Sequence, residues 1–162
     1  MSTFYLGIVP AKNEFLWVLL DGSNNEHLRI HDSKKAVIPD FGSRDRELDW
    51  VHTNVTESFI DLDLEGASVV QGALARTNTD AVLFRAQVEG VVLAALGARK
   101  VSVTSIKKAS MPTEFGLKRG ASVADIPGLP ALRTSRNLPK YFDEAISAAL
   151  VARRQVQLAQ AA

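Results

Sequence analysis

The sequence predicts a single α/β domain built on a mixed five-stranded sheet with helices on its faces. The 162 residues have an ordinary globular composition, with 46% hydrophobic and 23% charged residues. Three strand-like segments joined by short links open the chain, which is typical of an antiparallel meander. Helical and strand patterns then alternate, which favours parallel strands with helices packed against the sheet.

The meander is predicted from the first 31 residues. Residues 4–9 and 15–20 are short apolar runs separated by a turn at 10–13, and Asp21-Gly22-Ser23 is a strong turn signal. Residues 27–31 alternate between apolar and polar positions, as expected of a half-exposed third strand. The first strand has few polar positions, so we expect it at the centre of the sheet.

Ser43 is the predicted N-cap of an amphipathic helix over 44–60, and 67–71 is the predicted fourth strand. Thr79 and Asp80 open the most apolar helix, 80–96, which ends at Gly97. Its apolar residues surround much of its circumference, so we expect this helix to be largely buried.

The fifth strand is predicted over 100–104, and Ser105 is predicted to cap a short helix ending at Ala109. Four prolines and three glycines within 111–139 predict a long connection without a continuous helix. A final helix is predicted over about 140–156. The domain is thus expected to cover 1–156, and 157–162 to form a frayed tail.

Composition excludes several classes of protein. The absence of cysteine excludes disulfides, thiolate metal sites and cysteine nucleophiles. No uninterrupted apolar run reaches the roughly 18 residues that cross a bilayer, and no signal peptide is evident. We therefore expect a cytoplasmic protein without a membrane partner.

The net charge of +1 hides an uneven distribution. Residues 1–98 hold 8 Lys/Arg and 14 Asp/Glu, a balance of −6, whereas 99–140 hold 9 and 2, a balance of +7. This asymmetry indicates a basic surface on an acidic body, as a polyanion-binding protein has, although a solvated basic loop would give the same count.

Local motifs in this order resemble the RuvC-type Holliday-junction resolvases, which have the ribonuclease H-like fold. The segments that carry the resemblance are Leu6-Gly7-Ile8-Val9-Pro10, Val69-Val70-Gln71, Glu89-Gly90-Val91, Val103-Thr104-Ser105-Ile106-Lys107-Lys108-Ala109 and Asp143-Glu144-Ala145-Ile146-Ser147-Ala148-Ala149. The resemblance covers about 4–152. It implies a ribonuclease H-like sheet and a homodimer paired through a long apolar helix.

The resemblance also implies a nuclease site in which carboxylates hold two divalent cations. In the family, one acid ends the first strand and another ends the fourth, but Val9 and Val70 occupy those positions here. Magnesium prefers oxygen ligands, so valine cannot replace them. Only the closing helix keeps acids, Asp143 and Glu144. We expect no cofactor, except Mg²⁺ or Mn²⁺ if the site is active.

Glu14 is the one acid that could compensate. If the first two strands turn at 10–13, Glu14 lies almost opposite Val9, so Glu14, Asp143 and Glu144 could form a rearranged metal site. Alternatively, Glu14 and Glu144 are surface acids, and Asp143 neutralises the N-terminus of the closing helix.

Five cations are candidate ligands for nucleic-acid phosphates: Lys107, Lys108, Arg76, Lys118 and Arg119. Lysine can hold a phosphate as a compact point charge, but simple solvation of a short helix explains the lysine pair equally well. We therefore expect a RuvC-like domain whose nuclease site is largely lost and which retains DNA or RNA binding through 99–140. The alternatives are a protein-interaction subunit on the same scaffold and a metal-dependent nuclease with relocated carboxylates.

Overall fold

A five-stranded sheet lies at the centre of the structure, a computed structural model that describes residues 2–73 and 79–162. The strand order is β3-β2-β1-β4-β5. The first three strands form the predicted antiparallel meander, and β4 and β5 are added parallel to β1. The strands are β1 (Phe4–Pro10), β2 (Glu14–Asp21), β3 (Arg29–Val37), β4 (Leu64–Gln71) and β5 (Ser102–Lys107).

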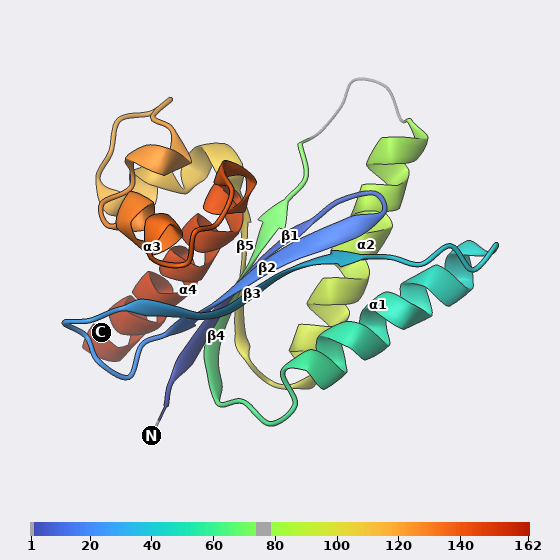
Figure 1. The fold of residues 1–162 in the computed structure, drawn as a ribbon, viewed down its shortest axis with the longest axis horizontal. Helices are drawn as coiled ribbons and strands as arrows, with labels where there is room; N and C mark the ends of the chain where they lie inside the picture. The colour runs from blue at the N-terminus through green and yellow to red at the C-terminus, as the bar shows by residue number, and fades with distance from the viewer. Residues whose placement is uncertain (1, 74–78) are drawn as a thin grey trace.

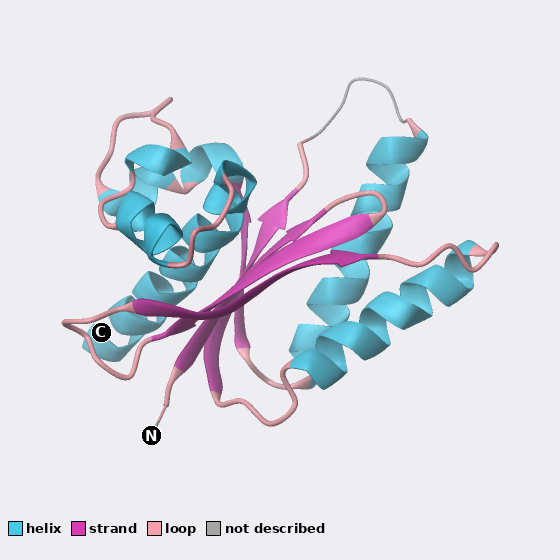
Figure 2. Cartoon of the chain, viewed as in Figure 1, coloured by secondary structure: helices cyan, strands magenta, loops and turns pink. Residues whose placement is uncertain are grey.

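Helices cover both faces of the sheet (Figures 1 and 2). One face carries α1 (Arg44–Ser58) and α2 (Asp80–Ala98), and the other carries α3 (Leu129–Ser135) and α4 (Asp143–Ala161). Each layer encloses its own apolar cluster, and the two clusters use alternate residues of the same strands. All seven residues of β1 are buried, which confirms its predicted central position.

The close contact between α4 and β1 depends on glycine. A Cβ atom at Gly7 would overlap the backbone of α4 at Ala145 and Ala149. Alanines on this face of α4 also keep its side chains short. Because a backbone atom cannot move aside as a side chain can, Gly7 sets the height of α4 above the sheet, and with it the position of the helix N-terminus.

The edge strands differ most from the sequence prediction. β3 covers Arg29–Val37 instead of 27–31, because an edge strand exposes most of its side chains and can include the polar run 32–35. A register shift between Leu19 and Leu20 also breaks its alternation. β5 likewise ends at Lys107 instead of residue 104, since Ser105 pairs with Val69. The short helix predicted from Ser105 is therefore wrong, and only a 3₁₀ turn, η1 (Lys108–Ser110), follows the strand.

Helix boundaries are closer to expectation. Thr79 caps α2 through its hydroxyl, which accepts a hydrogen bond from the Val82 N–H at 3.3 Å. Ser43 is at the predicted N-cap of α1 in extended conformation, but its side chain forms no capping hydrogen bond. α1 ends at Ser58, two residues earlier than predicted. α4 covers Asp143–Ala161 instead of about 140–156, so most of the tail predicted to fray at 157–162 is helical.

The connection between β5 and α4 has more structure than the sequence indicated. It contains the 3₁₀ turns η2 (Pro112–Phe115), η3 (Val123–Asp125) and η4 (Lys140–Phe142) besides α3. Buried residues of this connection, Met111, Ile126 and Leu129 among them, belong to the cluster under α4. The connection is therefore an ordered part of the domain that lies beside the carboxyl ends of the parallel strands.

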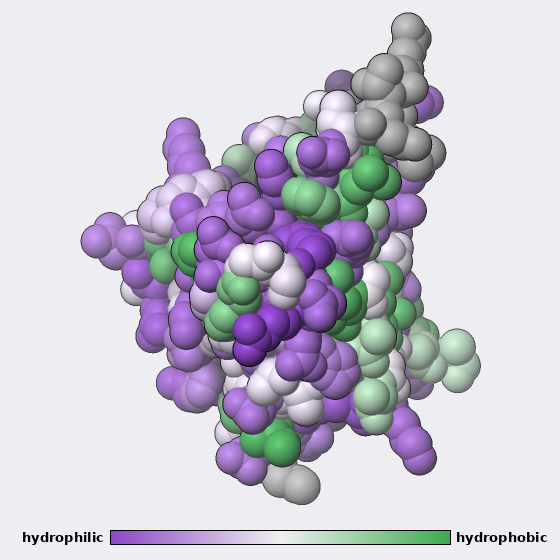
Figure 3. All heavy atoms as spheres, turned by 90° about the vertical axis from the view of Figure 1, so that its right-hand side faces the viewer, coloured by the Kyte–Doolittle hydropathy of each residue, from purple (hydrophilic) through white to green (hydrophobic). Residues whose placement is uncertain are grey.

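The prediction that α2 is largely buried is wrong for this chain on its own. Only Val88, Val92, Ala95 and Leu96 are buried, because the helix contacts its own molecule along one side. Figure 3 looks onto the α1 and α2 side, where hydrophobic side chains run below the grey atoms. α2 also has the length and the mean hydropathy of a membrane span. The sequence contains no uninterrupted apolar run of this length, because Arg85 and Glu89 lie between the apolar residues of the helix. The packing of α2 on α1 and the sheet makes this weak evidence for a membrane span.

Candidate functional site

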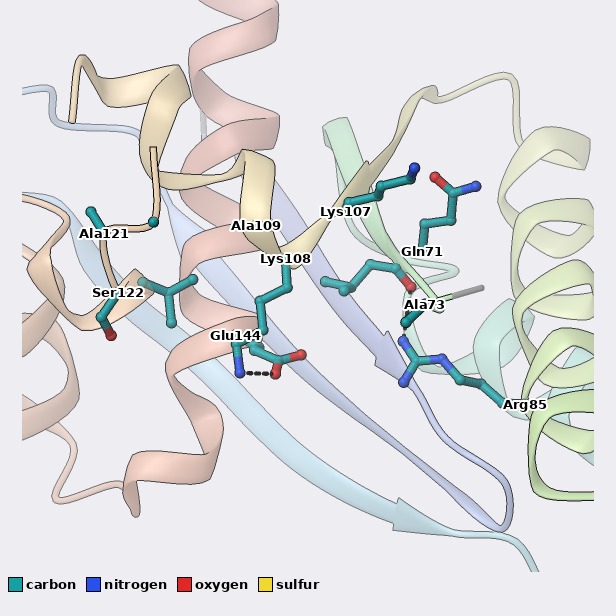
Figure 4. A pocket seen from close by; sticks show the side chains of 12 residues that line it. Gln71, Ala73, Arg85, Lys107, Lys108, Ala109, Ala121, Ser122 and Glu144 are labelled. Carbon is teal, nitrogen blue, oxygen red and sulfur yellow. Dashed lines mark hydrogen bonds and ion pairs between the residues drawn. The ribbon is translucent and has the colours of Figure 1, made fainter. Parts of the chain in front are cut away.

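The three parallel strands end at one edge of the sheet, where a cavity of about 500 Å³ opens. In open α/β sheets, ligands bind in the crevice outside the carboxyl ends of the strands. Here the end of β4, the end of β5, the first turn of α4, the segment before η3 and one residue of α2 line the cavity (Figure 4). The fold therefore brings five distant parts of the chain to one place.

The sheet is apolar near the ends of β1 and β4, next to the cavity. Val9 and Val70 are 8% and 1% exposed, and both belong to the apolar cluster under α4. Val70 also lines the cavity. An acid at position 70 would have lined the cavity, and one at position 9 would have lain near the end of the neighbouring strand β1. The valines instead make both positions part of the apolar core.

An ion pair between two residues that line the cavity lies beside these valines. The Lys108 Nζ atom lies 2.8 Å from an Oε1 atom of Glu144, as the dashed line in Figure 4 marks. Lys108 comes from η1, directly after β5, and Glu144 from the first turn of α4. The lysine side chain is 60% exposed and the glutamate side chain 26%. Of the two acids predicted on the closing helix, Glu144 thus reaches the cavity, and an ammonium group is its partner.

Asp143 is held elsewhere. Its two carboxylate oxygens lie 2.9 and 2.6 Å from the Nη1 atom of Arg133 in α3, and it is buried. It is not among the residues that line the cavity. The pair therefore fixes the start of α4 against α3, which agrees with the structural alternative for Asp143 better than with a ligand role.

The expected position of Glu14 is wrong. In the β1–β2 hairpin, Leu16 lies opposite Val9. Glu14 comes two residues before Leu16, nearer the hairpin turn and beyond the last residue of β1. Its carboxylate forms an ion pair with Lys35 of β3 at 3.3 Å. The expectation failed because β1 continues past Val9, with Pro10 opposite Phe15, so the turn is shorter than the 10–13 turn predicted from sequence.

The predicted basic residues are only partly brought together. Lys107 and Lys108 line the cavity, and Lys118 and Arg119 are exposed directly before Gly120 and Ala121, which also line it. Arg76 lies outside the described residues. We call Lys107, Lys108, Lys118 and Arg119 the basic rim.

Not all cations of 99–140 belong to this rim. Lys100 precedes β5 and Lys107 ends it, so the two lie about 20 Å apart at 3.3 Å per residue. Arg99 donates to backbone oxygens of Phe59 and Leu62, between α1 and β4. The +7 charge of this segment is therefore distributed over the molecule and does not form one surface.

Arg85 is a site residue that the sequence prediction missed. It reaches the cavity from α2, and its Nη2 atom lies 3.4 Å from the carbonyl oxygen of Val70. Its Nε atom is buried without a hydrogen-bond partner among the described residues. Gly72 makes room for it, since a Cβ there would lie 2.8 Å from Nε. A lone arginine in the most apolar predicted helix was the signal that could have identified it.

Comparison with known proteins gives a consistent result for the fold. No protein-family model matches the chain, and no curated protein sequence matches it. Among solved structures, Thermus thermophilus RuvC matches 98% of this chain and 97% of its own, with a TM-score of 0.74 and 16% identity. The T. thermophilus RuvC complex with a Holliday junction substrate matches 98% and 96%, with a TM-score of 0.73 and 15% identity. The chain has a RuvC-like fold.

A third structure extends this RuvC-like comparison beyond bacteria. The yeast mitochondrial Holliday junction resolvase Ydc2 matches 96% of this chain and 81% of its own, with a TM-score of 0.61 and 15% identity. The ribonuclease H-like architecture expected from the motifs is thereby confirmed for nearly the whole chain. At these identities the likeness establishes the fold and leaves the activity to the residues of the site.

Those residues do not fit the two divalent cations that the RuvC-like fold implies. The strand positions expected to supply oxygen ligands are Val9 and Val70, and the carboxylate that does reach the cavity is paired with Lys108. Within 2–73 and 79–162, no three His, Cys, Asp or Glu side chains are grouped as metal ligands. Hard divalent cations need several oxygen ligands, and the cavity offers one carboxylate and three cationic side chains.

Proposed function

We propose that this chain is a RuvC-like protein that has lost metal-dependent nuclease activity and binds nucleic acid through the basic rim. The observation that carries the proposal is the replacement at the carboxyl edge of the sheet. Apolar side chains occupy the strand positions of the family's acids, and Lys108 pairs with the remaining glutamate. The edge thus has a net positive charge without a bound metal.

The basic rim suits the phosphate backbone. Lys107, Lys118 and Arg119 are exposed and take part in no ion pair among the described residues. Contacts of this kind supply affinity and position and carry no base information. The RuvC structure with a Holliday junction substrate supports DNA as the partner, and a branched DNA as the first ligand to test.

Salt titration of DNA binding tests this part of the proposal. We expect the full chain to bind duplex and four-way-junction DNA at low salt, with affinity falling steeply as salt rises. The variant Lys107→Ala/Lys118→Ala/Arg119→Ala should bind more weakly, and the slope of log K against log salt should decrease by about 0.9 for each lost phosphate contact. Lys34→Ala, an exposed lysine on β3, is the matched control.

Two outcomes would overturn the proposal. If the protein binds no DNA or RNA at low salt, the basic rim is ordinary solvated surface, and a protein-interaction subunit becomes the better reading. Mn²⁺-dependent cleavage of junction DNA that is lost in Glu144→Gln or Asp143→Asn would instead establish a nuclease with relocated carboxylates.

We also propose a homodimer paired through α2. Leu83 is 48% exposed, and Ala86, Gly90 and Ala94 follow it at helical spacing on the exposed side. A Cβ at Gly90 would contact nothing, so this side is open in the single chain. Small side chains would let two such helices approach closely.

Equilibrium sedimentation tests the dimer. We expect a dimer for the native chain, a monomer for Ala86→Arg, and a dimer for the control Ala131→Arg, which changes an exposed residue of α3. A native monomer would refute the dimer.

The RuvC-like fold, with α2 packed on α1 and the sheet, supports a soluble protein. We place this protein in the cytoplasm. Cell fractionation checks this placement, and recovery in the membrane pellet after a salt wash would contradict it.

A further inference from the structure

The cavity at the carboxyl edge has the charge of an anion site. Three cationic side chains line it, Arg85, Lys107 and Lys108, against the single carboxylate of Glu144. These four side chains sum to a charge of +2. They come from α2, β5, η1 and α4, so the fold, and no local run of basic sequence, assembles them.

Arg85 gives the strongest indication of a missing ligand. A buried N–H without a partner costs free energy, and a charged donor costs more. Among the described residues, the Nε atom of Arg85 has no hydrogen-bond partner, and its guanidinium group donates one hydrogen bond, from Nη2 to the Val70 oxygen at 3.4 Å. The guanidinium group, which arranges its donors in a planar fork, is therefore left with unused donors at the cavity.

We propose that this cavity binds a phosphate monoester dianion directly, with Arg85, Lys107 and Lys108 as its ligands and no metal ion. The inference deepens the proposed function by giving the basic rim a pocket for a terminal phosphate, and it rests on that function only for the source of the phosphate. A monoester carries about −1.5 to −2 at neutral pH. This matches the +2 of the cavity better than a backbone diester, which carries −1.

The cavity also has room for more than the phosphate. At about 500 Å³ it lies in the range of small-molecule sites. The rest of its lining is mostly apolar and small, with two uncharged polar side chains, Gln71 and Ser122. The apolar residues are Val70, Ala73, Ala109, Ala121 and Val123. The planar face of a nucleobase can pack on this apolar wall, while the phosphate faces the cations. The ligand class is thus a nucleotide, either free or at the phosphorylated end of a strand.

Glu144 would act as a competitor in this site. Its carboxylate forms an ion pair with Lys108 that a bound phosphate would have to replace, and its negative charge repels a phosphate in the same cavity. Because the Lys108 side chain is 60% exposed, it can turn from the carboxylate to a bound phosphate without unpacking the core. Removing the charge of Glu144 should therefore strengthen phosphate binding. A metal site would behave in the opposite way, since its affinity depends on that carboxylate.

Isothermal titration of the full chain in EDTA tests the proposal with inorganic phosphate, adenosine 5′-monophosphate, and one oligonucleotide with a 5′-phosphate or a 5′-hydroxyl. We expect adenosine 5′-monophosphate to bind the native chain. It should bind Arg85→Gln more weakly, by roughly tenfold or more. Glu144→Gln should bind it several-fold more tightly. Lys34→Gln should bind as the native chain does, and circular dichroism verifies the folding of each variant. A preference for the 5′-phosphorylated over the 5′-hydroxyl strand identifies a strand end as the source. Binding of the monophosphate without that preference identifies a free nucleotide.

The proposal is overturned if none of the phosphate ligands binds either the native chain or Glu144→Gln. It is also overturned if the phosphate ligands bind only when EDTA is omitted, or if Glu144→Gln abolishes binding, since the phosphate would then be held through a metal. The test is separate from that of the proposed function. If duplex DNA binds in a salt-dependent way but no phosphate ligand binds in the cavity, the proposal for the basic rim still stands. If a nucleotide binds but duplex DNA does not, the proposal for the cavity still stands.

Discussion

The pair between Arg133 and Asp143 gives a prediction that separates a structural from a catalytic role of this acid. The side chains of Arg133 and Asp143 are 18% and 9% exposed, so water screens the pair little. Arg133→Met keeps most of the apolar stem of the side chain and leaves the carboxylate buried without its cation.

Removing one partner of a buried pair typically costs about 3–5 kcal/mol. Asp143 is the first residue of α4, where the helix dipole favours a negative charge by about 1 kcal/mol. We therefore expect Arg133→Met to lower the free energy of unfolding by about 2–4 kcal/mol. In a chain of this length, that corresponds to a decrease in Tm of roughly 4–16 °C.

Urea denaturation followed by circular dichroism and by tryptophan fluorescence measures the effect. Arg136→Met is the matched control, because Arg136 follows the same helix, is exposed and forms no ion pair in the described part of the chain. Arg133→Met/Asp143→Leu removes both charges and should recover much of the lost stability. A cost of Arg133→Met below about 0.5 kcal/mol, typical of a surface site, would refute the reasoning and leave Asp143 free for another role.

Two further predictions concern the fold. Gly7→Ala should destabilise the protein by about 3 kcal/mol or more in urea denaturation, since the new Cβ would overlap the backbone of α4, and an unchanged midpoint would contradict the packing of α4 on β1. Hydrogen bonds from the Ser23 hydroxyl and backbone N–H, together with Arg29, lower the pKa of Asp21 from 3.8 to about 2. A lowered pKa stabilises the fold above the unfolded value, here by about 2 kcal/mol, and this stability is lost as the pH falls from 4 through 2. Urea midpoints measured between pH 2 and 7 should therefore fall less steeply for Asp21→Asn than for the native chain, and parallel curves would refute the assignment.

The fold was largely predictable from sequence because its strongest signals are local. β1 is apolar throughout, and the turn at Asp21-Gly22-Ser23 and the Thr79 cap of α2 determine their structures within a few residues. The edge strands were not predictable to the same degree. In β3 only Ile30 and Ala36 are buried, so its limits follow from pairing with β2 and not from its own alternation.

The site was predictable by position but not by pairing. The sequence placed Val9 and Val70 at strand ends and Glu144 on the closing helix, and all three lie at or beside the carboxyl edge. It did not reveal that Lys108 pairs with Glu144 or that Asp143 pairs with Arg133, because both contacts join segments whose distance depends on the path of residues 111–139. Arg85 was missed for a related reason, since only the tertiary structure turns its side of α2 toward the cavity.

The ion pair between Lys108 and Glu144 changes what the surroundings can do to this edge of the protein. A divalent ion exchanges with solvent, so the charge of a metal site follows the free concentration of the ion and is removed by chelators. The ammonium group of Lys108 is covalently part of the chain. The positive charge at the ends of β4 and β5 is therefore present in every folded molecule, whatever the supply of magnesium or manganese.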